Sequence, residues 1–250
     1  MRRIAIINQK GGVGKTATAV NVSHILSEKF KALLIDLDPQ SAATYSLGVS
    51  PTAGHKNIYN LLKGQGTLKD AIVKKGRLDV LTSSLELSGA ETELATIPGR
   101  EFLLKEIMDP LKDYQYVFID CPPSLGILTV NAMVAVNELL IPVQADTLSL
   151  QGLSKLLETI GIVKERINPD LKILGVVVTS FDSRKILSKQ VVEKLKAHFG
   201  KKLFKTKIRT NVSIAECPGE GKPITEYAPK SHGSEDYKSL SKEIIRRGNR

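Results

Sequence analysis

The stretch of sequence that most constrains this chain is KGGVGKT, residues 10–16. An apolar run, residues 4–7, precedes it, and a segment with helical spacing, residues 17–26, follows it. Glycines between a strand and a helix free backbone N–H groups to face an anion, and the helix N-terminus adds partial positive charge. Lys15 would then reach the outer phosphates of a nucleotide, while the Thr16 hydroxyl would hold Mg²⁺. We therefore predict a nucleotide-binding loop made of Lys10, Gly11, Gly12, Val13, Gly14, Lys15, Thr16 and Ala17.

This loop departs at one position from the standard pattern G-x-x-x-x-G-K-[ST]. Gln9 stands where the first glycine is expected, and a second lysine, Lys10, follows it. The alternative interpretation is a glycine-rich turn with an incidental lysine. The predicted strand before the stretch and the predicted helix after it favour the phosphate-binding loop.

The 250 residues are enough to bury a full core, and we expect a single domain, residues 1–250. No apolar stretch approaches the roughly 18 residues that would span a bilayer, and the first residues lead directly into the loop. A cytoplasmic protein is the expectation. Two cysteines, Cys121 and Cys217, cannot form a disulfide framework, and the four histidines lack metal-ligand spacing.

Positive charge is concentrated in the last third of the chain. Residues 1–163 contain 16 basic and 16 acidic side chains, whereas residues 164–250 contain 20 basic and 10 acidic ones. The net charge of +10 therefore arises entirely from the last third. This asymmetry suggests a surface that binds a polyanion, and a merely solvated basic face is the alternative.

Aspartates follow two of the predicted strands. Asp36 and Asp38 come after the apolar residues 32–35, and Asp120 comes after residues 116–119. Ligands of open α/β sheets bind at the carboxyl ends of the strands. Beside a phosphate loop, an aspartate in the position of Asp120 is suited to hold a metal-bound water of Mg²⁺.

Strand and helix patterns alternate along the rest of the chain. This alternation predicts an α/β fold in which helices cover both faces of a mostly parallel sheet. Further strands are expected at residues 78–81, 139–143, 173–179 and 203–208, and further helices at residues 101–111, 150–166, 187–199 and 236–247.

Together, these motifs resemble the ParA (Soj-like) ATPases of bacterial chromosome and plasmid partition, within the deviant P-loop group that includes MinD. The resemblance covers nearly the whole chain, because its blocks occur in the family's order. They are NQKGGVGKT (8–16), LLIDLDPQ (33–40), FIDCPPS (118–124), IPVQAD with QGL (141–153) and VTSFDSR (178–184).

The resemblance implies a weak ATPase that uses ATP, yields ADP and needs Mg²⁺. It implies a homodimer with two nucleotides between its subunits, in which Lys10 reaches the phosphates bound by the partner. Asp38 would orient the attacking water, Asp120 would hold the Mg²⁺ shell, and Asp36 would support the metal side. Thr179 would lie near the adenine. For Asp36 and Asp38, helix capping or turn formation is the alternative.

The resemblance also implies ATP-dependent binding of nonspecific DNA, association with the nucleoid, and a ParB-type partner that stimulates hydrolysis and release. Arg184 matches a DNA-contact arginine, Lys185 adds a neighbouring charge, and Lys230 falls in a second basic site. Ser213 replaces a basic residue that the family often uses for DNA. Either Arg209 stands in for it, or DNA binding is weaker than in the family. Such contacts would go to phosphates.

Three other functions compete with this one. A MinD-like membrane-cycling ATPase would need an amphipathic C-terminal helix with bulky apolar residues, which the sequence SLSKEIIRRGNR does not favour. A redox relative would bind a cluster through paired cysteines, and such a pair is not evident in the sequence. A scaffold that binds nucleotide without hydrolysing it would not need Asp38, which this chain has. Since Met1 lies only three residues before the first strand, we expect no helix-turn-helix extension. From the composition of the C-terminal helix we expect no membrane binding.

Overall fold

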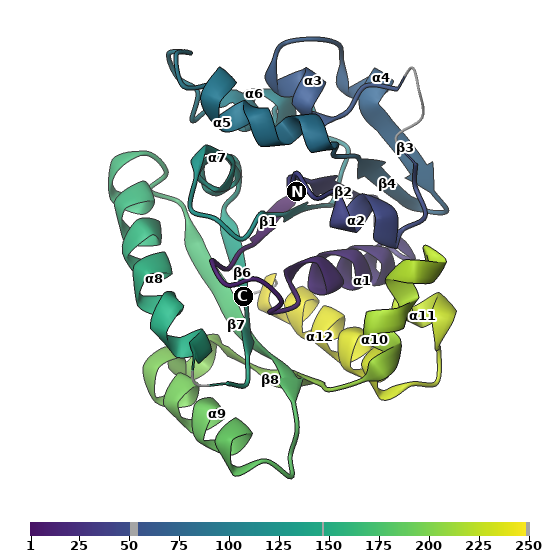
Figure 1. Cartoon of the computed structure of the whole chain (residues 1–250), viewed down its shortest axis with the longest axis vertical. Helices are drawn as coiled ribbons and strands as arrows, with labels where there is room; N and C mark the ends of the chain where they lie inside the picture. Colours follow the sequence, from purple (N-terminus) through teal and green to yellow (C-terminus); the bar gives the residue numbers. More distant parts are fainter. Residues whose placement is uncertain (51–54, 147, 249–250) are drawn as a thin grey trace.

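The sheet of this α/β protein has eight strands, in the order β3-β4-β2-β5-β1-β6-β7-β8. A computed structural model describes residues 1–50, 55–146 and 148–248 (Figure 1). All neighbouring strands are parallel except β3, which pairs antiparallel with β4. The strands are β1 (Arg2–Ile6), β2 (Ala32–Asp36), β3 (Ile72–Lys75), β4 (Leu78–Leu81), β5 (Tyr116–Asp120), β6 (Glu138–Gln144), β7 (Lys172–Phe181) and β8 (Leu203–Arg209).

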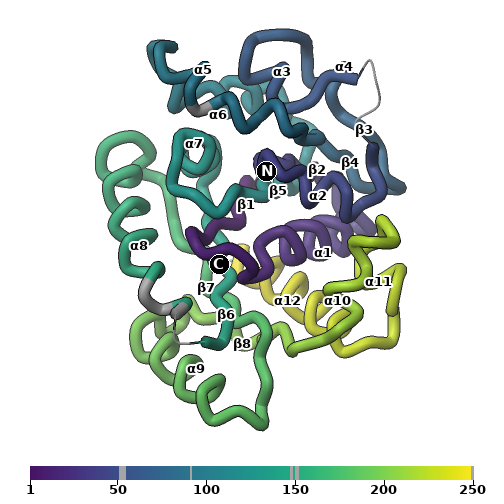
Figure 2. Tube along the Cα trace, viewed as in Figure 1, coloured from purple at the N-terminus to yellow at the C-terminus, as the bar shows by residue number. Residues whose placement is uncertain are grey.

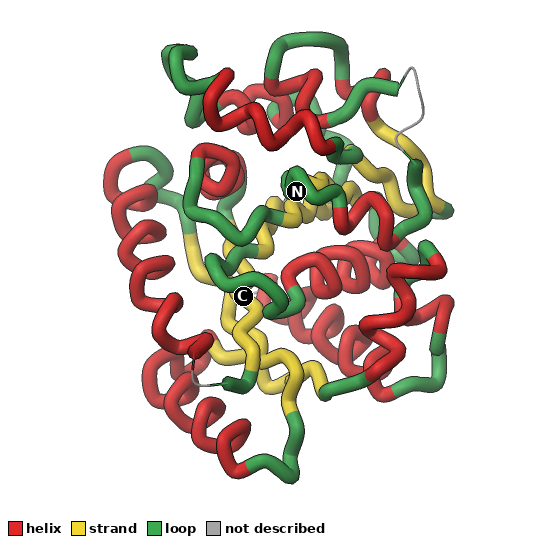
Figure 3. The backbone as a smooth tube through the Cα atoms, in the orientation of Figure 1, coloured by secondary structure: helices red, strands yellow, loops and turns green. Residues whose placement is uncertain are grey.

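Helices cover both faces of the sheet, as Figure 3 shows. They are α1 (Lys15–Ser27), α2 (Ala42–Ser46), α3 (Ile58–Leu62), α4 (Leu68–Ala71), α5 (Ala90–Glu93), α6 (Leu103–Met108), α7 (Ile127–Ala135), α8 (Leu148–Arg166), α9 (Ile186–Phe199), α10 (Val212–Glu216), α11 (Ile224–Tyr227) and α12 (His232–Gly248). Three short 3₁₀ helices are η1 (Leu85–Gly89), η2 (Gly200–Lys202) and η3 (Cys217–Glu220). Among the helices of the described residues, none is both long and apolar enough to cross a membrane.

The core has two layers, one on each face of the sheet. Side chains alternate between the faces along a strand, so Leu34 and Phe118 point into one layer while Leu33 and Val117 point into the other. Helices α1 and α12 lie side by side over the first layer, as the trace in Figure 2 also shows. Helices α7, α8 and α9 cover the second. Strands β2 and β5 are buried along their whole length, which explains their continuous apolar sequences.

The predicted fold class is confirmed, and each predicted strand lies within two residues of an observed one. Several elements were not predicted, among them the short helices α2, α4, α5, α10 and α11, strand β3 and helix α7. Strand β3 has only four residues, two apolar and then two lysines, at the edge of the sheet, and it joins β4 through a short turn at Gly76 (φ 60°). Helix α7 is apolar on nearly every side because it is buried between other helices, so it shows no 3.6-residue periodicity.

A buried asparagine ties helix α1 to the C-terminal part of the chain. The side-chain Oδ1 of Asn21 accepts a hydrogen bond from the backbone N–H of Ile224 at 2.7 Å, and its Nδ2 donates to the Ala17 carbonyl at 2.8 Å. Substitution Asn21→Ala leaves the buried Ile224 N–H without a partner. The free energy of unfolding, measured by urea denaturation, should fall by about 1–3 kcal/mol.

The matched control is Asn137→Ala, at an exposed position before β6. This substitution should change the unfolding free energy by less than about 0.5 kcal/mol. Equal effects of the two substitutions would show that the Asn21 hydrogen bond adds no stability.

Candidate functional site

The loop between β1 and α1 forms the centre of the candidate site. Gly12 (φ 73°) and Gly14 (φ 84°) adopt the left-handed backbone conformation that disfavours other residues. The N–H of Thr18 closes the first turn of α1 on the Gly14 carbonyl at 2.9 Å. The loop therefore lies at the carboxyl edge of the sheet, where the first turn of α1 can face an anion.

Lys15 is folded back over this loop. Its side chain is 6% exposed, and its Nζ donates to the Lys10 carbonyl at 3.2 Å. Burial lowers the pKa of Lys15, an effect that the nearby carboxylates of Asp120 and Asp38 oppose. The Lys15 ammonium is therefore held on the backbone of the loop that is predicted to bind phosphates.

Asp120, the last residue of β5, carries the most unusual environment of the site. Its side chain is fully buried, and neither carboxylate oxygen has a hydrogen-bond partner among the described residues. Burial, followed by the neighbouring Asp36 charge, raises the pKa of Asp120 well above its ordinary value. The Thr16 hydroxyl is near enough to lower this pKa but forms no hydrogen bond of normal geometry with the carboxylate, and the Lys15 charge also offsets the shift only partly. A buried carboxylate without a partner is costly unless a cation compensates it.

These residues fit a magnesium ion that arrives with a nucleotide. The Thr16 hydroxyl and the Asp120 carboxylate are oxygen donors of the kind that Mg²⁺ prefers. The described residues include no cluster of three or more His, Cys, Asp or Glu side chains that could hold a metal by itself. Mg²⁺ commonly uses one or two protein oxygens plus phosphate oxygens, so a small donor set matches this ion.

Asp36 lies beside Asp120 in the register of β2 and β5, but its contacts differ. Its Oδ2 accepts from the N–H and the hydroxyl of Thr44, at 2.8 and 2.7 Å, and its Oδ1 accepts from the Asp38 N–H at 3.2 Å. Burial raises its pKa to about 6, although the Thr44 hydrogen bonds act in the opposite direction. The structure thus gives Asp36 a clear role in holding α2, and its part at the metal stays a prediction.

Asp38 caps the turn that follows β2. Its Oδ1 accepts from the Gln40 N–H at 2.9 Å, and its backbone carbonyl accepts from the Ser83 hydroxyl at 2.8 Å. The turn geometry that was the alternative interpretation is therefore present. It is compatible with a catalytic role, because one oxygen of a carboxylate can fix its orientation while the other remains available.

Lys10 makes contacts that the sequence analysis did not foresee. Its Nζ lies 2.7 Å from Oδ2 and 3.0 Å from Oδ1 of Asp146, and 3.1 Å from the Ser149 hydroxyl. Hydrogen bonds from Lys10 and Ser149 hold the pKa of Asp146 below its ordinary value, although burial acts to raise it. Lys10 is thus held within its own chain, with about a third of each side chain of the ion pair exposed.

Two further contacts fix the loop against β6 and β7. Asn8, which the sequence analysis did not select, donates from Nδ2 to the Pro142 carbonyl at 2.7 Å and accepts the Lys10 N–H at 3.0 Å. The hydroxyl of Thr179 donates to the Val13 carbonyl at 2.8 Å. Thr179 therefore contacts the loop directly, and its place beside an adenine stays a prediction.

Asp146 follows a predicted strand, and this position was the one feature of the sequence that could have identified it as a site residue.

The predicted DNA contacts at Arg184 and Lys185 lie on the exposed turn after β7. The Arg184 side chain is 88% exposed and forms an ion pair with Asp182, with Nη2 and Oδ2 2.9 Å apart. Hydrogen bonds from Arg184 lower the pKa of Asp182 to about 2. Lys230 is exposed in the turn between α11 and α12.

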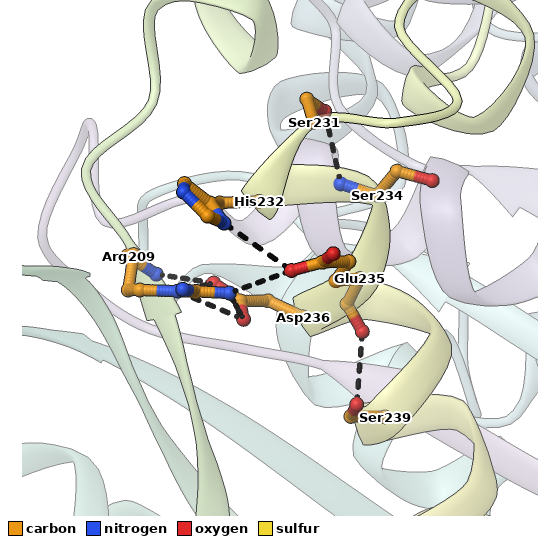
Figure 4. A network of polar contacts seen from close by, with 7 residues as sticks. All are labelled: Arg209, Ser231, His232, Ser234, Glu235, Asp236 and Ser239. Carbon is orange, nitrogen blue, oxygen red and sulfur yellow. Dashed lines mark hydrogen bonds and ion pairs between the residues drawn. The ribbon is translucent and has the colours of Figure 1, made fainter.

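Arg209 differs from these residues, as Figure 4 shows. Its guanidinium binds both oxygens of Asp236, the shortest distance being 2.7 Å, and also contacts Glu235 at 3.3 Å. His232 in turn lies 3.2 Å from the same Glu235 oxygen. Two carboxylates therefore neutralise the charge that the sequence analysis assigned to DNA. This bidentate pair holds the start of α12 on the end of β8. Because Arg184 is also paired with a carboxylate and 42% of the Arg209 side chain is exposed, the contact of Arg209 with DNA stays a prediction.

The environment of Asp120 leads to a test by pH. The pKa of Asp120 is higher in the folded chain than in the unfolded chain, where it is near 4. The protonated side chain therefore does not destabilise the fold at a pH below about 4, whereas ionisation of the buried carboxyl at higher pH lowers the free energy of unfolding. The substitution Asp120→Asn removes this dependence. In urea unfolding without nucleotide, the variant should match the wild type near pH 4 and exceed its unfolding free energy by at least about 1 kcal/mol near pH 7.

The control substitution is Asp170→Asn, at an exposed position. Its effect on unfolding should not change with pH. A constant difference between Asp120→Asn and the wild type from acidic to neutral pH would contradict the burial of an uncompensated carboxylate.

Comparison with known proteins places the chain in a family. A family model described as an AAA domain matches residues 1–173. The sporulation initiation inhibitor protein Soj of Bacillus subtilis is 44% identical over 249 residues, with 98% of each chain covered. The chromosome partitioning protein ParA of Myxococcus xanthus is 43% identical over 250 residues, covering 98% of this chain and 88% of that protein.

A solved structure agrees with the site. Cobyrinic acid a,c-diamide synthase from Mycobacterium smegmatis, with bound ADP and magnesium, has a TM-score of 0.87 and 33% identity, covering 100% of this chain and 96% of that chain. The full-length identity to Soj and ParA is the stronger likeness in sequence. This chain therefore belongs to the ParA/Soj family of P-loop ATPases.

Proposed function

We propose that this protein is a weak ATPase that acts as a nucleotide switch in DNA segregation. Its ATP-bound dimer would bind nonspecific DNA, and hydrolysis, stimulated by a ParB-type partner, would release it. The observation that carries the proposal is the buried, unpartnered carboxylate of Asp120 beside Lys15 and the phosphate loop. That arrangement is costly in the empty protein and is compensated when Mg²⁺ and a nucleotide bind.

In this proposal the loop N–H groups and Lys15 bind the β- and γ-phosphates. The Thr16 hydroxyl and Asp120 hold Mg²⁺, which would neutralise charge on the phosphates. Asp38 orients the attacking water with the carboxylate oxygen that Gln40 does not occupy. Phosphoryl transfer to water needs little covalent chemistry from the protein, so positioning and charge supply the rate.

The contacts of Lys10 support a dimer-dependent activity. In one chain its ammonium is paired with Asp146, so it does not serve the phosphates bound by its own loop. A partly exposed ion pair is weak, and a nucleotide γ-phosphate in a partner subunit offers a larger negative charge. Lys10 would then leave Asp146 and complete the partner's site.

The proposed DNA surface consists of Arg184, Lys185 and Lys230. The turns after β7 and β8 are adjacent, because Phe181 and Arg209 are partners in the sheet. Lys230 comes two residues before His232, which joins the same network as Arg209. Exposed side chains on these neighbouring turns are suited to phosphate contacts without reading sequence.

The burial of the apolar side chains of α12 favours DNA over a membrane as the surface that the ATP-bound dimer binds. Helix α12 directs Tyr237, Leu240 and Ile244 into the core, so these residues are unavailable to lipid.

Strands from residue 2 to residue 209 share one sheet, which supports one ATPase domain across residues 1–250. A cytoplasmic protein associated with the nucleoid is consistent with this proposal.

The catalytic proposal is tested with Asp38→Ala and Lys15→Ala. Asp38→Ala should keep ATP binding but lower steady-state turnover by at least about 100-fold, and it should remain bound to DNA in ATP. Lys15→Ala should lose nucleotide affinity, measured by calorimetry. Unchanged phosphate release by Asp38→Ala would remove this residue from the mechanism.

The DNA proposal is tested by gel shift with ATP, ADP and no nucleotide, at two salt concentrations. Arg184→Glu should weaken ATP-dependent binding at least about tenfold and lower the salt dependence, since phosphate contacts are lost. The matched control is Lys69→Glu, at an exposed position on α4, beyond the opposite edge of the sheet. Equal binding by both variants, or binding that ignores nucleotide, would contradict the switch.

A further inference from the structure

A cavity of about 510 Å³ lies away from the nucleotide loop, where helices α1, α11 and α12 meet. Helix α1 contributes His24 and Ile25, the turn after it contributes Glu28 and Lys29, and α12 contributes residues 238, 241, 242 and 245. The helix rises 1.5 Å per residue, so His24 is about 13 Å along α1 from Lys15. A cavity of this size is in the range that holds small molecules, and it is separate from the phosphate site.

The walls of this cavity combine an apolar floor with a basic rim. Ile25 and Ile245 are half-buried members of the core layer under α1 and α12. The rim contains Lys29, Lys238 and Lys242, all exposed, and none of them has a carboxylate partner among the described residues. Apolar floor and unpaired ammonium groups together favour a ligand with an apolar body and an anionic head.

The acidic residues of the cavity do not cancel this charge. Glu226 is already paired with His24, with Oε1 and Nε2 2.9 Å apart, and the Thr225 hydroxyl lies 3.2 Å from Nδ1 of the same ring. Glu28, at the end of α1, is the other acid in the wall. Three unpaired lysines therefore face one carboxylate that has no ion-pair partner in the described chain.

Ser241 also lies in the wall of this cavity, on α12. It is 1% exposed, and its hydroxyl has no hydrogen-bond partner in the described part of the chain. Because protein atoms enclose this hydroxyl, it is not accessible from the cavity. Contacts to a ligand therefore come from the apolar floor and the lysines of the rim.

We propose that this cavity binds a small organic anion with an apolar body, such as an aromatic or aliphatic carboxylate or sulfonate. The apolar body lies against Ile25 and Ile245. The anionic head accepts hydrogen bonds from the ammonium groups of Lys238 or Lys242 at the rim. The nucleotide and the DNA proposed above have no part in this site, so its failure would leave the proposed function intact.

The first experiment compares two fluorescent probes that share an apolar body. Anilinonaphthalene sulfonate carries an anionic head, and phenylnaphthylamine lacks it. Saturating ADP and Mg²⁺ are present, so that the nucleotide loop is occupied. The sulfonate should bind one site per chain at least about tenfold more tightly than the neutral probe, whereas equal affinities would overturn the proposal.

The second experiment locates the site with charge variants. Lys238→Glu/Lys242→Glu should weaken binding of the sulfonate probe at least about tenfold. The control Lys69→Glu/Lys74→Glu makes the same change in net charge at exposed positions around β3 and should bind as the wild type does. Thermal unfolding of each variant checks that it is folded.

Amide chemical shifts complete the test, because they do not depend on any substitution. On addition of the sulfonate probe, the shifts should change at residues 24–29 and 238–245. Loss of probe binding only in the double variant, with shifts at these residues, supports the proposal. Equal binding by both double variants, or shifts confined to other residues, would overturn it.

Discussion

The buried carboxylate of Asp120 is the constraint on which the rest of the site depends. Parallel pairing of β2 and β5 puts Asp36 and Asp120 side by side at a dry edge of the sheet. Burial in a medium of low polarity raises the pKa of both carboxyl groups, and the charge of Asp36 raises the pKa of Asp120 further. Only one of the two has hydrogen bonds, so the other is the one that a cation would compensate.

The phosphate loop owes its shape to segments far away in the sequence. Asn8 bonds to β6, Val13 bonds to the end of β7, and Lys10 is paired with a residue just beyond β6. Each contact joins residues separated by more than 130 positions. The loop is therefore linked by hydrogen bonds to the ends of β6 and β7. A nucleotide that moves the loop would also change the contacts of Lys10.

The basic character of the last third is divided among different tasks. Arg184, Lys185 and Lys230 are exposed on neighbouring turns, whereas Arg209 is used to join α12 to β8. Lys238 and Lys242 face a cavity behind α1. Charge alone did not separate these tasks, because a lysine or arginine has the same sequence signature whether it meets solvent, a carboxylate or a ligand.

The sequence by itself determined the α/β class, the positions of seven strands, and the phosphate loop with Lys15, Thr16 and Asp120. It could do so because apolar runs that end in glycine or aspartate report on local backbone geometry and on burial. Helix α7 escaped prediction since it is buried on nearly all sides, and β3 escaped since its four residues lie at an exposed edge. Contacts were decided only by the tertiary structure. The pairing of Lys10 with Asp146, the neutralised Arg209 and the hydroxyl of Ser241 without a partner depend on which distant segments pack together, which no local pattern records.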